Sequence, residues 1–348
     1  TKFTLIAPDI ELSPFLEANG LKGRFSFIPV ENEHIPFIKA VRKELRNKGF
    51  DIIHTHGFSA GVQGELAGWG NGKKTVHLMT AHDVFLSKQF LGWRGWCRKK
   101  AVETMLGRID HIHTVTKDAR QNMLEFFPRL DRERIHTILH GVDTSGYAEA
   151  VGQDLKARLE IERSRPLIGF FGRFMAQKGF RDLVDAMRIL ADKGTLSSVP
   201  MVATFGWGGF IREDYQCLTD RGLSDYFVQF PHAEDMPSML KSVDMVAMPS
   251  LWEACGLLAM EAFSAGTPLI ASNCIGLREV LHDTPARVVP PKDPAALAAA
   301  IDDFTRSSPR ETFEAFAPEA RTRFSVERPA RALHDLYLKL AKNAGGAP

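Results

Sequence analysis

The chain has 348 residues, of which 44% are apolar and 25% are charged, and its 44 basic and 42 acidic residues leave a formal net charge of +2. These values are typical of a soluble globular protein and exclude a disordered, collagen-like or disulfide-stapled chain. The charge balance does not favour a nucleic-acid-binding surface along the chain, so no nucleic-acid partner is expected. At about 150 residues per domain, the length predicts two domains.

Short apolar segments alternate with helical patterns along most of the chain. The predicted strands cover 3–7, 25–28, 51–54, 75–80, 111–115, 135–138, 166–171, 200–205, 226–230, 244–248, 268–271 and 286–289. The clearest helical patterns between them cover 35–48, 58–69, 94–107, 117–127, 179–192, 235–242 and 254–265. This alternation is typical of parallel sheets that helices cover on both faces.

The alternation breaks over 145–165, which is polar and precedes Pro166. We therefore expect an α/β protein of two doubly wound, Rossmann-like domains, at 1–150 and 151–325, with a C-terminal segment at 326–348. Apolar residues recur at helical spacing over 326–343, which predicts an amphipathic helix. Ligands of open parallel sheets bind beyond the carboxyl ends of the strands, so candidate site residues are sought in the loops that follow strands.

The four cysteines, at 97, 217, 255 and 274, form no CxxC pair and no zinc-type spacing. We interpret them as free thiols in a reducing compartment. No apolar run reaches the roughly 18 residues of a membrane-spanning helix. The expected location is cytoplasmic, with contact to the inner face of a membrane only at the protein surface.

The loop after the strand 166–171 combines Gly172, Arg173, Lys178 and Gly179 with the start of a helix. A glycine where the strand ends lets the backbone turn tightly. A helix N-terminus offers unpaired N–H groups and a partial positive charge, to which the two cations add. This combination suits a diphosphate, although the same residues also fit an ordinary solvated loop.

Two glutamates lie eight residues apart after the strand 244–248. If both belonged to one helix, Glu253 and Glu261 would lie about 12 Å apart along its axis and about 80° apart around it. They would then grip two parts of one elongated ligand instead of acting on a single bond. The alternative is that Glu253 caps the helix and that Glu261, in an otherwise apolar segment, is held in an ion pair.

These segments resemble the retaining GT-B glycosyltransferases of glycosyltransferase family 4. The Glu253–Glu261 spacing is similar to the E-x7-E signature of that family, and Gly172-Arg173 with Lys178-Gly179 is similar to its phosphate loop. Similar motifs recur in the same order at 51–57, 140–143, 249–250 and 265–268. The resemblance covers nearly the whole chain and implies a GT-B fold, in which the domain 151–325 binds a nucleotide-sugar donor, 1–150 lies on the acceptor side, and the last helix crosses back to the first domain.

The resemblance also implies roles for individual residues. Arg173 and Lys178 would bind the nucleotide diphosphate, Glu253 the hydroxyls of the donor sugar, and Glu261 the ribose. The donor site would further include Gly172, Cys255, Gly256 and Leu257, the last three through backbone N–H groups. His82 would be the active-site histidine that faces the donor sugar, and His56, Gly57 and Asp83 would line the acceptor side.

The implied reaction moves a sugar from a UDP-, GDP- or ADP-sugar to a glycan, a lipid-linked acceptor or a small molecule, with retention at the anomeric carbon. Cations and helix N–H groups would stabilise the leaving diphosphate, so neither a metal nor another cofactor is expected. Synthesis of polysaccharide or cell-envelope glycan is the expected setting. Two alternatives remain: a non-catalytic protein that binds sugar nucleotides, and a GT-B nucleotide-sugar epimerase.

The chain departs from the family pattern at three places. The family has a Gly-rich loop after its first strand, whereas the strand 3–7 matches the second strand of the family, so we expect an omitted first strand and loop. Ala254-Cys255 stands where Gly-Phe is usual, which alters the expected sugar pocket. The segment 205–209 replaces a more regular Gly-x-Gly-Pro and leaves the nucleobase open.

Two further features of the sequence bear on function. Aromatic residues and cations are interleaved over 90–100, a composition that suits either an anionic membrane surface or a helix that covers the first sheet with its cations in water. His54 and His56, like His111 and His113, alternate by two and so share a face of a strand. Without a third ligand at a plausible spacing, these pairs predict histidines that line the cleft or have hydrogen-bond partners, and no metal site.

Overall fold

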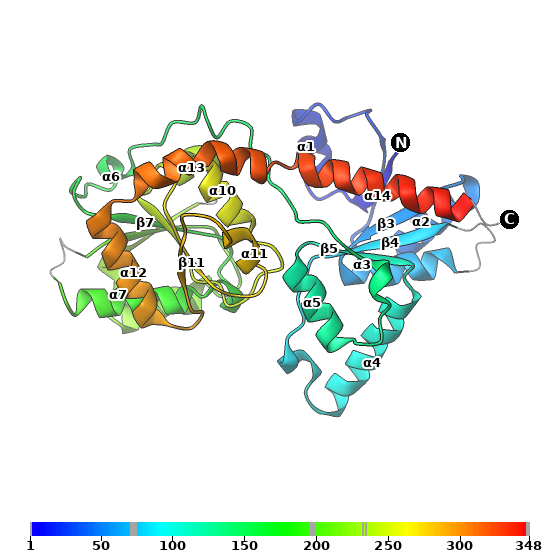
Figure 1. The fold of residues 1–348 in the computed structure, drawn as a ribbon, viewed down its shortest axis with the longest axis horizontal. Coiled ribbons are helices and arrows are strands. Elements are labelled where there is room, and N and C mark those ends of the chain that lie inside the picture. The colour runs from blue at the N-terminus through cyan, green and yellow to red at the C-terminus, as the bar shows by residue number, and fades with distance from the viewer. Residues whose placement is uncertain (1, 70–74, 195–198, 232, 234, 346–348) are drawn as a thin grey trace. The chain divides into compact units, whose positions relative to one another are not determined.

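The computed structural model describes residues 2–69, 75–194, 199–231, 233 and 235–345, and its contacts divide the chain into two units (Figure 1). Unit 1 comprises 1–114, 123–137 and 333–348, and unit 2 comprises 115–122 and 138–332. Each predicted strand is found within two residues of its expected ends. The domain ranges expected from the sequence stay predictions.

Unit 1 is built on parallel strands in two separate sheets. β1 (Thr4–Pro8) pairs with β2 (Ser26–Val30), and the second sheet has the order β3-β4-β5-β6. Its strands are β3 (Ile52–His56), β4 (Val76–Ala81), β5 (His111–Thr114) and β6 (Ile135–Thr137). β4 is buried along its whole length, as a strand covered on both faces requires. The helices are α1 (Leu12–Ala18), α2 (His34–Asn47), α3 (Gly57–Gly68), α4 (Gly92–Arg108), the end of α5 (Lys117–Phe126) and the larger part of α14 (Glu327–Gly345), with short 3-10 turns at Ser87–Phe90 and Arg132–Arg134.

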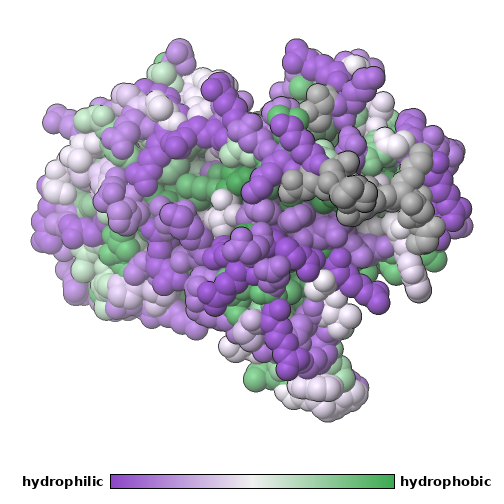
Figure 2. Space-filling view, turned by 45° about the vertical axis from the view of Figure 1, so that its right-hand side comes forward, coloured by the Kyte–Doolittle hydropathy of each residue, from purple (hydrophilic) through white to green (hydrophobic). Residues whose placement is uncertain are grey.

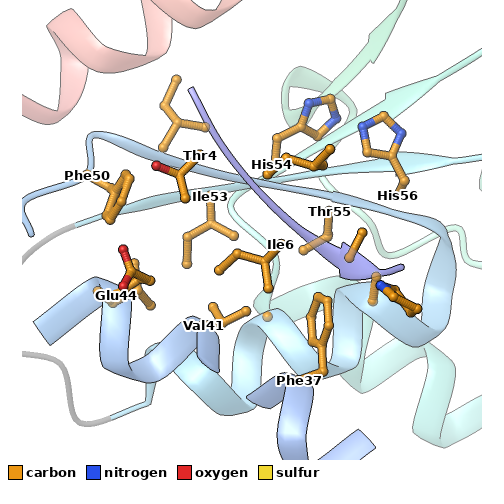
Figure 3. Close-up of a pocket in the computed structure, with 17 residues that line it drawn as sticks. Thr4, Ile6, Phe37, Val41, Glu44, Phe50, Ile53, His54, Thr55 and His56 are labelled. Carbon is orange, nitrogen blue, oxygen red and sulfur yellow. The ribbon is translucent and has the colours of Figure 1, made fainter. Parts of the chain in front are cut away.

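A cavity of about 370 Å³ is lined by β1 and β3, which belong to different sheets (Figure 3). Ile6 and Ile53 line it from the two strands, and Phe37 and Val41 line it from α2. The parallel arrangement of unit 1 is therefore interrupted beside the strand that the resemblance matches with the family's second strand. The expectation of an omitted first strand stays a prediction.

Unit 2 contains one six-stranded parallel sheet of order β12-β11-β10-β7-β8-β9. Its strands are β7 (Leu167–Phe171), β8 (Met201–Phe205), β9 (Phe227–Phe230), β10 (Met245–Met248), β11 (Leu269–Ser272) and β12 (Arg287–Val289). Its helices are α6 (Leu155–Arg158), α7 (Phe180–Ala191), α8 (Ile211–Asp220), α9 (Met236–Lys241), α10 (Leu257–Ala265), α11 (Arg278–Leu281), α12 (Pro294–Ser307) and α13 (Arg310–Arg323), with 3-10 turns at Ala176–Lys178 and Ser224–Tyr226. The parallel sheets of both units agree with the predicted α/β, GT-B fold class.

The order of this sheet determines where its loops gather. β7 is central and its chain order reverses there, because β8 lies on one side of it and β10 on the other. All five residues of β7 are buried, and so is every residue of β10. Loops that follow β7, β8 and β10 therefore leave the same edge of the sheet at its switch point, where ligands of such sheets bind.

Candidate functional site

Two glycine turns bring the loops after β7 and β8 into contact in unit 2. Gly172 has φ 134° and Gly206 has φ 145°, and residues other than glycine rarely adopt such backbone angles. A Cβ atom at Gly206 would lie 2.2 Å from the carbonyl oxygen of Gly172. The amide of Gly172 donates to Phe205 O at 3.0 Å, and that of Phe174 donates to Trp207 O at 3.1 Å. The sequence 205–209 thus forms a close backbone wall beside the predicted phosphate loop.

Lys178 and Glu253, predicted separately from two loops, form an ion pair. Lys178 Nζ lies 2.7 Å from Glu253 Oε1, and the Glu253 side chain is 7% exposed. Ser250 Oγ donates to the same oxygen at 2.7 Å, and Gln177 Nε2 donates to Glu253 Oε2 at 3.3 Å. Both carboxylate oxygens therefore have partners, which offsets the cost of burying the charge.

The backbone around Glu253 is also fixed. Its amide donates to Ile275 O at 2.9 Å, and a Cβ atom at Gly276, where φ is 81°, would lie 2.0 Å from Glu253 O. Thr116, in the short segment 115–122 that groups with unit 2, donates its hydroxyl to Ala254 O at 3.0 Å. The turn that carries Glu253 is thus held from two directions.

The helix after Glu253 begins later than the sequence predicted. α10 starts at Leu257 with Gly256 as its N-cap, and the amide of Leu257 donates to Cys255 O at 3.0 Å. Glu253 therefore does not cap the helix, and the separation calculated for two residues of one helix does not apply. The reason is the tight turn at 255–257, which interrupts the helical hydrogen bonding. It also gives the Leu257 amide a partner inside the chain.

Glu261 lies in α10 without the ion pair that one interpretation of the sequence expected. Its side chain makes no hydrogen bond and no ion pair with any described residue. Burial raises the pKa of its carboxyl to about 7. Burial and the nearby Glu261 carboxyl also raise the pKa of the Tyr147 hydroxyl. A half-buried acid without a partner is a group that a bound hydroxyl can satisfy.

Other predicted donor-site residues differ in their surroundings. Arg173 is exposed, and within the described part of the chain it forms no hydrogen bond or ion pair. Cys255 is half-buried, and burial raises the pKa of its thiol to about 12, so it stays protonated. A Cβ atom at Gly256 would lie 2.2 Å from the Leu277 side chain, so a larger residue here would require Leu277 to shift.

The predicted acceptor-side residues lie together in unit 1, after β3 and β4. His56 Nδ1 lies 3.0 Å from His82 Nε2, and the two rings stack with centroids 5.3 Å apart. Burial lowers the pKa of His82, while the neighbouring Asp83 raises it. Gly57 begins α3 with φ 83°, and a Cβ atom built there would meet no atom within 4 Å. His56, His82 and Asp83 thus lie at the carboxyl ends of β3 and β4.

Sequence reasoning did not find every residue of these clusters. Ser250 lies in a segment that resembles the family and Gln177 lies in the predicted phosphate loop, but neither was given a role, because the motifs do not show that they contact Glu253. In unit 1, His54 bonds to Thr80 Oγ1 at 2.6 Å and to the Tyr337 hydroxyl at 2.5 Å. Tyr337 lies 283 residues from His54 in the chain, so no local pattern pairs them.

The described residues lack two features, a metal-binding cluster and a membrane-spanning helix. They contain no group of three or more His, Cys, Asp or Glu side chains that can hold a metal ion. They contain no helix that is both long and apolar enough to cross a bilayer. The segment 90–100 opens α4 and exposes Leu91, Trp93 and Trp96 by 71%, 73% and 61%. Figure 1 shows α4 running toward the lower end of unit 1, and the space-filling view in Figure 2 shows green and pale residues at that end.

Comparison with known proteins gives matches to both halves of the chain. Residues 2–145 match the family described as Glycosyltransferase Family 4, and residues 165–307 match Glycosyl transferases group 1. A 2-deoxystreptamine N-acetyl-D-glucosaminyltransferase of Streptomyces fradiae is 30% identical over 248 residues, which are 69% of this chain and 58% of that protein. A D-inositol 3-phosphate glycosyltransferase of Xylanimonas cellulosilytica is 29% identical over 313 residues, which are 85% of this chain and 74% of that protein. The chain thus spans less than two thirds of the length of the first of these relatives.

Solved structures agree with the fold. HepE of Anabaena in complex with UDP superposes with a TM-score of 0.78 at 18% sequence identity, covering 97% of this chain and 91% of that one. At this identity the likeness shows the fold alone, namely two parallel-sheet, Rossmann-like units of the GT-B class.

Proposed function

The chain belongs to the glycosyltransferases of group 1 and family 4, and from this premise we propose that it is an enzyme that transfers a sugar from a UDP-sugar to an acceptor with retention at the anomeric carbon. The observation that carries the proposal is the pairing of Lys178 with the buried Glu253 beside the glycine turns of unit 2. UDP is chosen over GDP and ADP because the similar structure of HepE was solved with UDP.

In this proposal the donor lies along the loops after β7, β8 and β10. Arg173, exposed and without a protein partner among the described residues, and Lys178 bind the diphosphate. Glu253 accepts hydrogen bonds from hydroxyls of the sugar, and Glu261 accepts them from the ribose. Gly172 and Gly256 provide close backbone approach, and Cys255 and Leu257 contribute backbone at the start of α10.

Departure of the nucleoside diphosphate builds negative charge on its β-phosphate. Cations that already contact the bound diphosphate stabilise that charge at little further reorganisation cost, because they are in place before the bond breaks. The acceptor attacks the same face, and the leaving phosphate takes the acceptor proton, so the reaction requires neither a strong protein base nor a metal ion or other cofactor. His82 faces the donor sugar in this scheme, and His56, Gly57 and Asp83 shape the acceptor side.

We propose a glycan or lipid-linked acceptor, with the enzyme in contact with an anionic membrane through 90–100. The support is the exposure of Leu91, Trp93 and Trp96 next to the exposed Arg94 and Arg98. Indole rings favour the membrane interface, and each cation near an anionic surface adds about 1 kcal/mol. This proposal places the work of the enzyme at the cytoplasmic face of a membrane.

Neither alternative is favoured by the comparisons. The relatives reported above are named as transferases, so an epimerase or a non-catalytic binding protein finds no support among them. The experiment that tests the proposal has two stages. Calorimetry with UDP, GDP and ADP first tests the donor site, where we expect preference for UDP. Transfer from UDP-glucose, UDP-galactose and UDP-N-acetylglucosamine to acceptor extracts follows, with the anomeric configuration read by NMR. Transfer with inversion, or release of an altered sugar nucleotide without an acceptor, would contradict the proposal.

A further inference from the structure

A continuous chain of hydrogen bonds in unit 1 joins the last helix to three strands of the sheet. The Tyr337 hydroxyl of α14 lies 2.5 Å from His54 Nδ1, and His54 Nε2 lies 2.6 Å from Thr80 Oγ1. Thr80 Oγ1 in turn lies 2.9 Å from His113 Nδ1. Thr80 is fully buried and His113 is 3% exposed, so the inner end of this chain is shielded from water.

The tautomer of His54 sets the direction of both of its hydrogen bonds. Burial, together with the nearby His56, His113, His82 and His77, lowers the pKa of His54 to about 3, so the ring is neutral at physiological pH. A neutral imidazole has one donor and one acceptor nitrogen. If the Tyr337 hydroxyl donates to Nδ1, then Nε2–H donates to Thr80, whose hydroxyl can in turn donate to His113 Nδ1. In the reverse direction every bond is inverted. In both cases both ring nitrogens of His54 are engaged.

The ring of His54 contacts that of His56, and the ring of His56 contacts that of His82, the predicted active-site histidine. Its centroid lies 4.4 Å from that of His56, and Figure 3 shows these two rings side by side on the face of β3 away from Phe37. His56 in turn stacks on His82 and bonds to it at 3.0 Å. A rotation of His54 therefore removes a wall against which His56 and then His82 are held.

We propose that Tyr337 is a positioning residue for His82 and that it acts through His54 and His56. The proposal rests on the function proposed above, in which His82 faces the donor sugar. Loss of the Tyr337 hydroxyl leaves His54 Nδ1 without this partner at a largely buried site, which favours another ring orientation. His82 lies in unit 1, whereas the proposed diphosphate site lies in unit 2. A small displacement of His82 should therefore lower the rate of transfer more than the affinity for the donor.

The test is Tyr337→Phe, which removes one oxygen and keeps the ring that packs against Phe3 and His54. We expect kcat to fall about tenfold while KM for UDP-sugar changes less than twofold. In the ligand-free protein, the NMR signals of the imidazole nitrogens of His54, His56 and His82 should shift. Tyr215→Phe is the matched control, since it removes a hydroxyl that lies 2.7 Å from a threonine hydroxyl, Thr204 Oγ1, in unit 2. It should leave the imidazole signals of unit 1 unchanged.

A second pair of variants tests the same chain from its other end. Thr80→Val removes the hydroxyl between His54 and His113 and should reproduce the ring shifts and the kcat loss, whereas Thr80→Ser keeps the hydroxyl and should restore both. Unchanged His56 and His82 signals in Tyr337→Phe and Thr80→Val would overturn this inference. Absence of any sugar transfer by the unmodified protein would instead overturn the proposed function, and the ring signals distinguish the two failures.

Discussion

Lys178 Nζ lies 2.7 Å from Glu253 Oε1, so the cation proposed to bind the diphosphate is neutralised in the ligand-free protein by the acid proposed to bind the sugar. Ser250 and Gln177 bond to the same carboxylate, which keeps it in place when the lysine turns toward another anion. In the proposed donor complex, Lys178 would therefore be shared between two anions, and no unpaired charge would be buried. Substitutions of Lys178 and of Glu253 should therefore have different effects on donor binding and on sugar transfer.

Changing Glu253 to Gln should separate donor binding from catalysis. The amide keeps the size of the side chain and can still bond to Ser250, but Lys178 is no longer neutralised. We expect UDP affinity to be unchanged or to rise up to about tenfold, while kcat for transfer falls about 10²-fold or more because the contacts to the sugar change in the transition state. Calorimetry and steady-state kinetics measure the two effects. Glu213→Gln, an exposed acid on α8, is the control, and a parallel loss of UDP affinity and kcat would argue against the proposed division of roles.

Changing Lys178 to Ala should weaken UDP binding and the fold together. The buried Glu253 loses its cation, and breaking a buried pair by removing one partner costs about 3 kcal/mol. We expect UDP affinity to fall about tenfold or more, kcat to fall about 10²-fold, and Lys178→Arg to recover part of each. Denaturant unfolding and calorimetry are the measurements. Lys193→Ala, at an exposed position just after α7, should change neither, and equal effects of the two alanine variants would contradict the prediction.

The strands were predictable because their signals are local. Continuous apolar runs such as Leu167–Phe171 and the glycines that end them indicate a buried parallel strand and a turn without any knowledge of the rest of the chain. The start of α10 was not predictable. The helical pattern of the sequence begins at Ala254, but the turn at 255–257 delays the helix to Leu257. Helix ends depend on such local competition more than on apolar spacing.

In the candidate site, too, local motifs were predictable and contacts between distant segments were not. Lys178 and Glu253 were found from motifs in separate loops, but their direct contact depends on the order of β7 and β10 in the sheet. Tyr337 was assigned only to an amphipathic helix, since its hydrogen bond to His54 joins residues at opposite ends of the chain. Local patterns identify residue types, whereas partners distant in the sequence require the folded structure.

The segment 90–100 should bind anionic vesicles. We expect sedimentation with vesicles of phosphatidylcholine and phosphatidylserine, weaker sedimentation at higher salt, and little with phosphatidylcholine alone, because the attraction to cations is screened. Trp93→Ala with Trp96→Ala should lower binding about tenfold or more, since two exposed indoles are lost. Trp69→Ala is the matched control, because Trp69 is 77% exposed outside this segment. Unchanged binding of the double variant would remove the proposed membrane contact.

Changing Glu261 to Gln should stabilise the ligand-free protein at high pH. The pKa of Glu261 is raised to about 7 by burial, above its ordinary value of 4.5. An acid whose pKa is raised by folding contributes stability that is complete below about pH 4.5 and is lost as the pH rises through 7. Glutamine does not titrate, so the variant should match the unmodified protein near pH 4.5 and exceed it by about 2 kcal/mol at pH 8, after allowance for partial exposure. Urea unfolding at the two pH values measures the difference.

The same carboxyl should release a proton when UDP binds. Hydrogen bonds from the ribose hydroxyls favour the ionised form, so binding lowers the pKa of Glu261 and, at pH 7, releases about half a proton. Calorimetry in two buffers of different ionisation enthalpy measures this release, because the apparent enthalpy then depends on the buffer. In Glu261→Gln we expect the release to disappear and UDP affinity to fall about tenfold. If the variant releases as many protons as the unmodified protein, Glu261 does not contact the ribose, and the stabilising effect of the substitution at pH 8 is all that remains of its role.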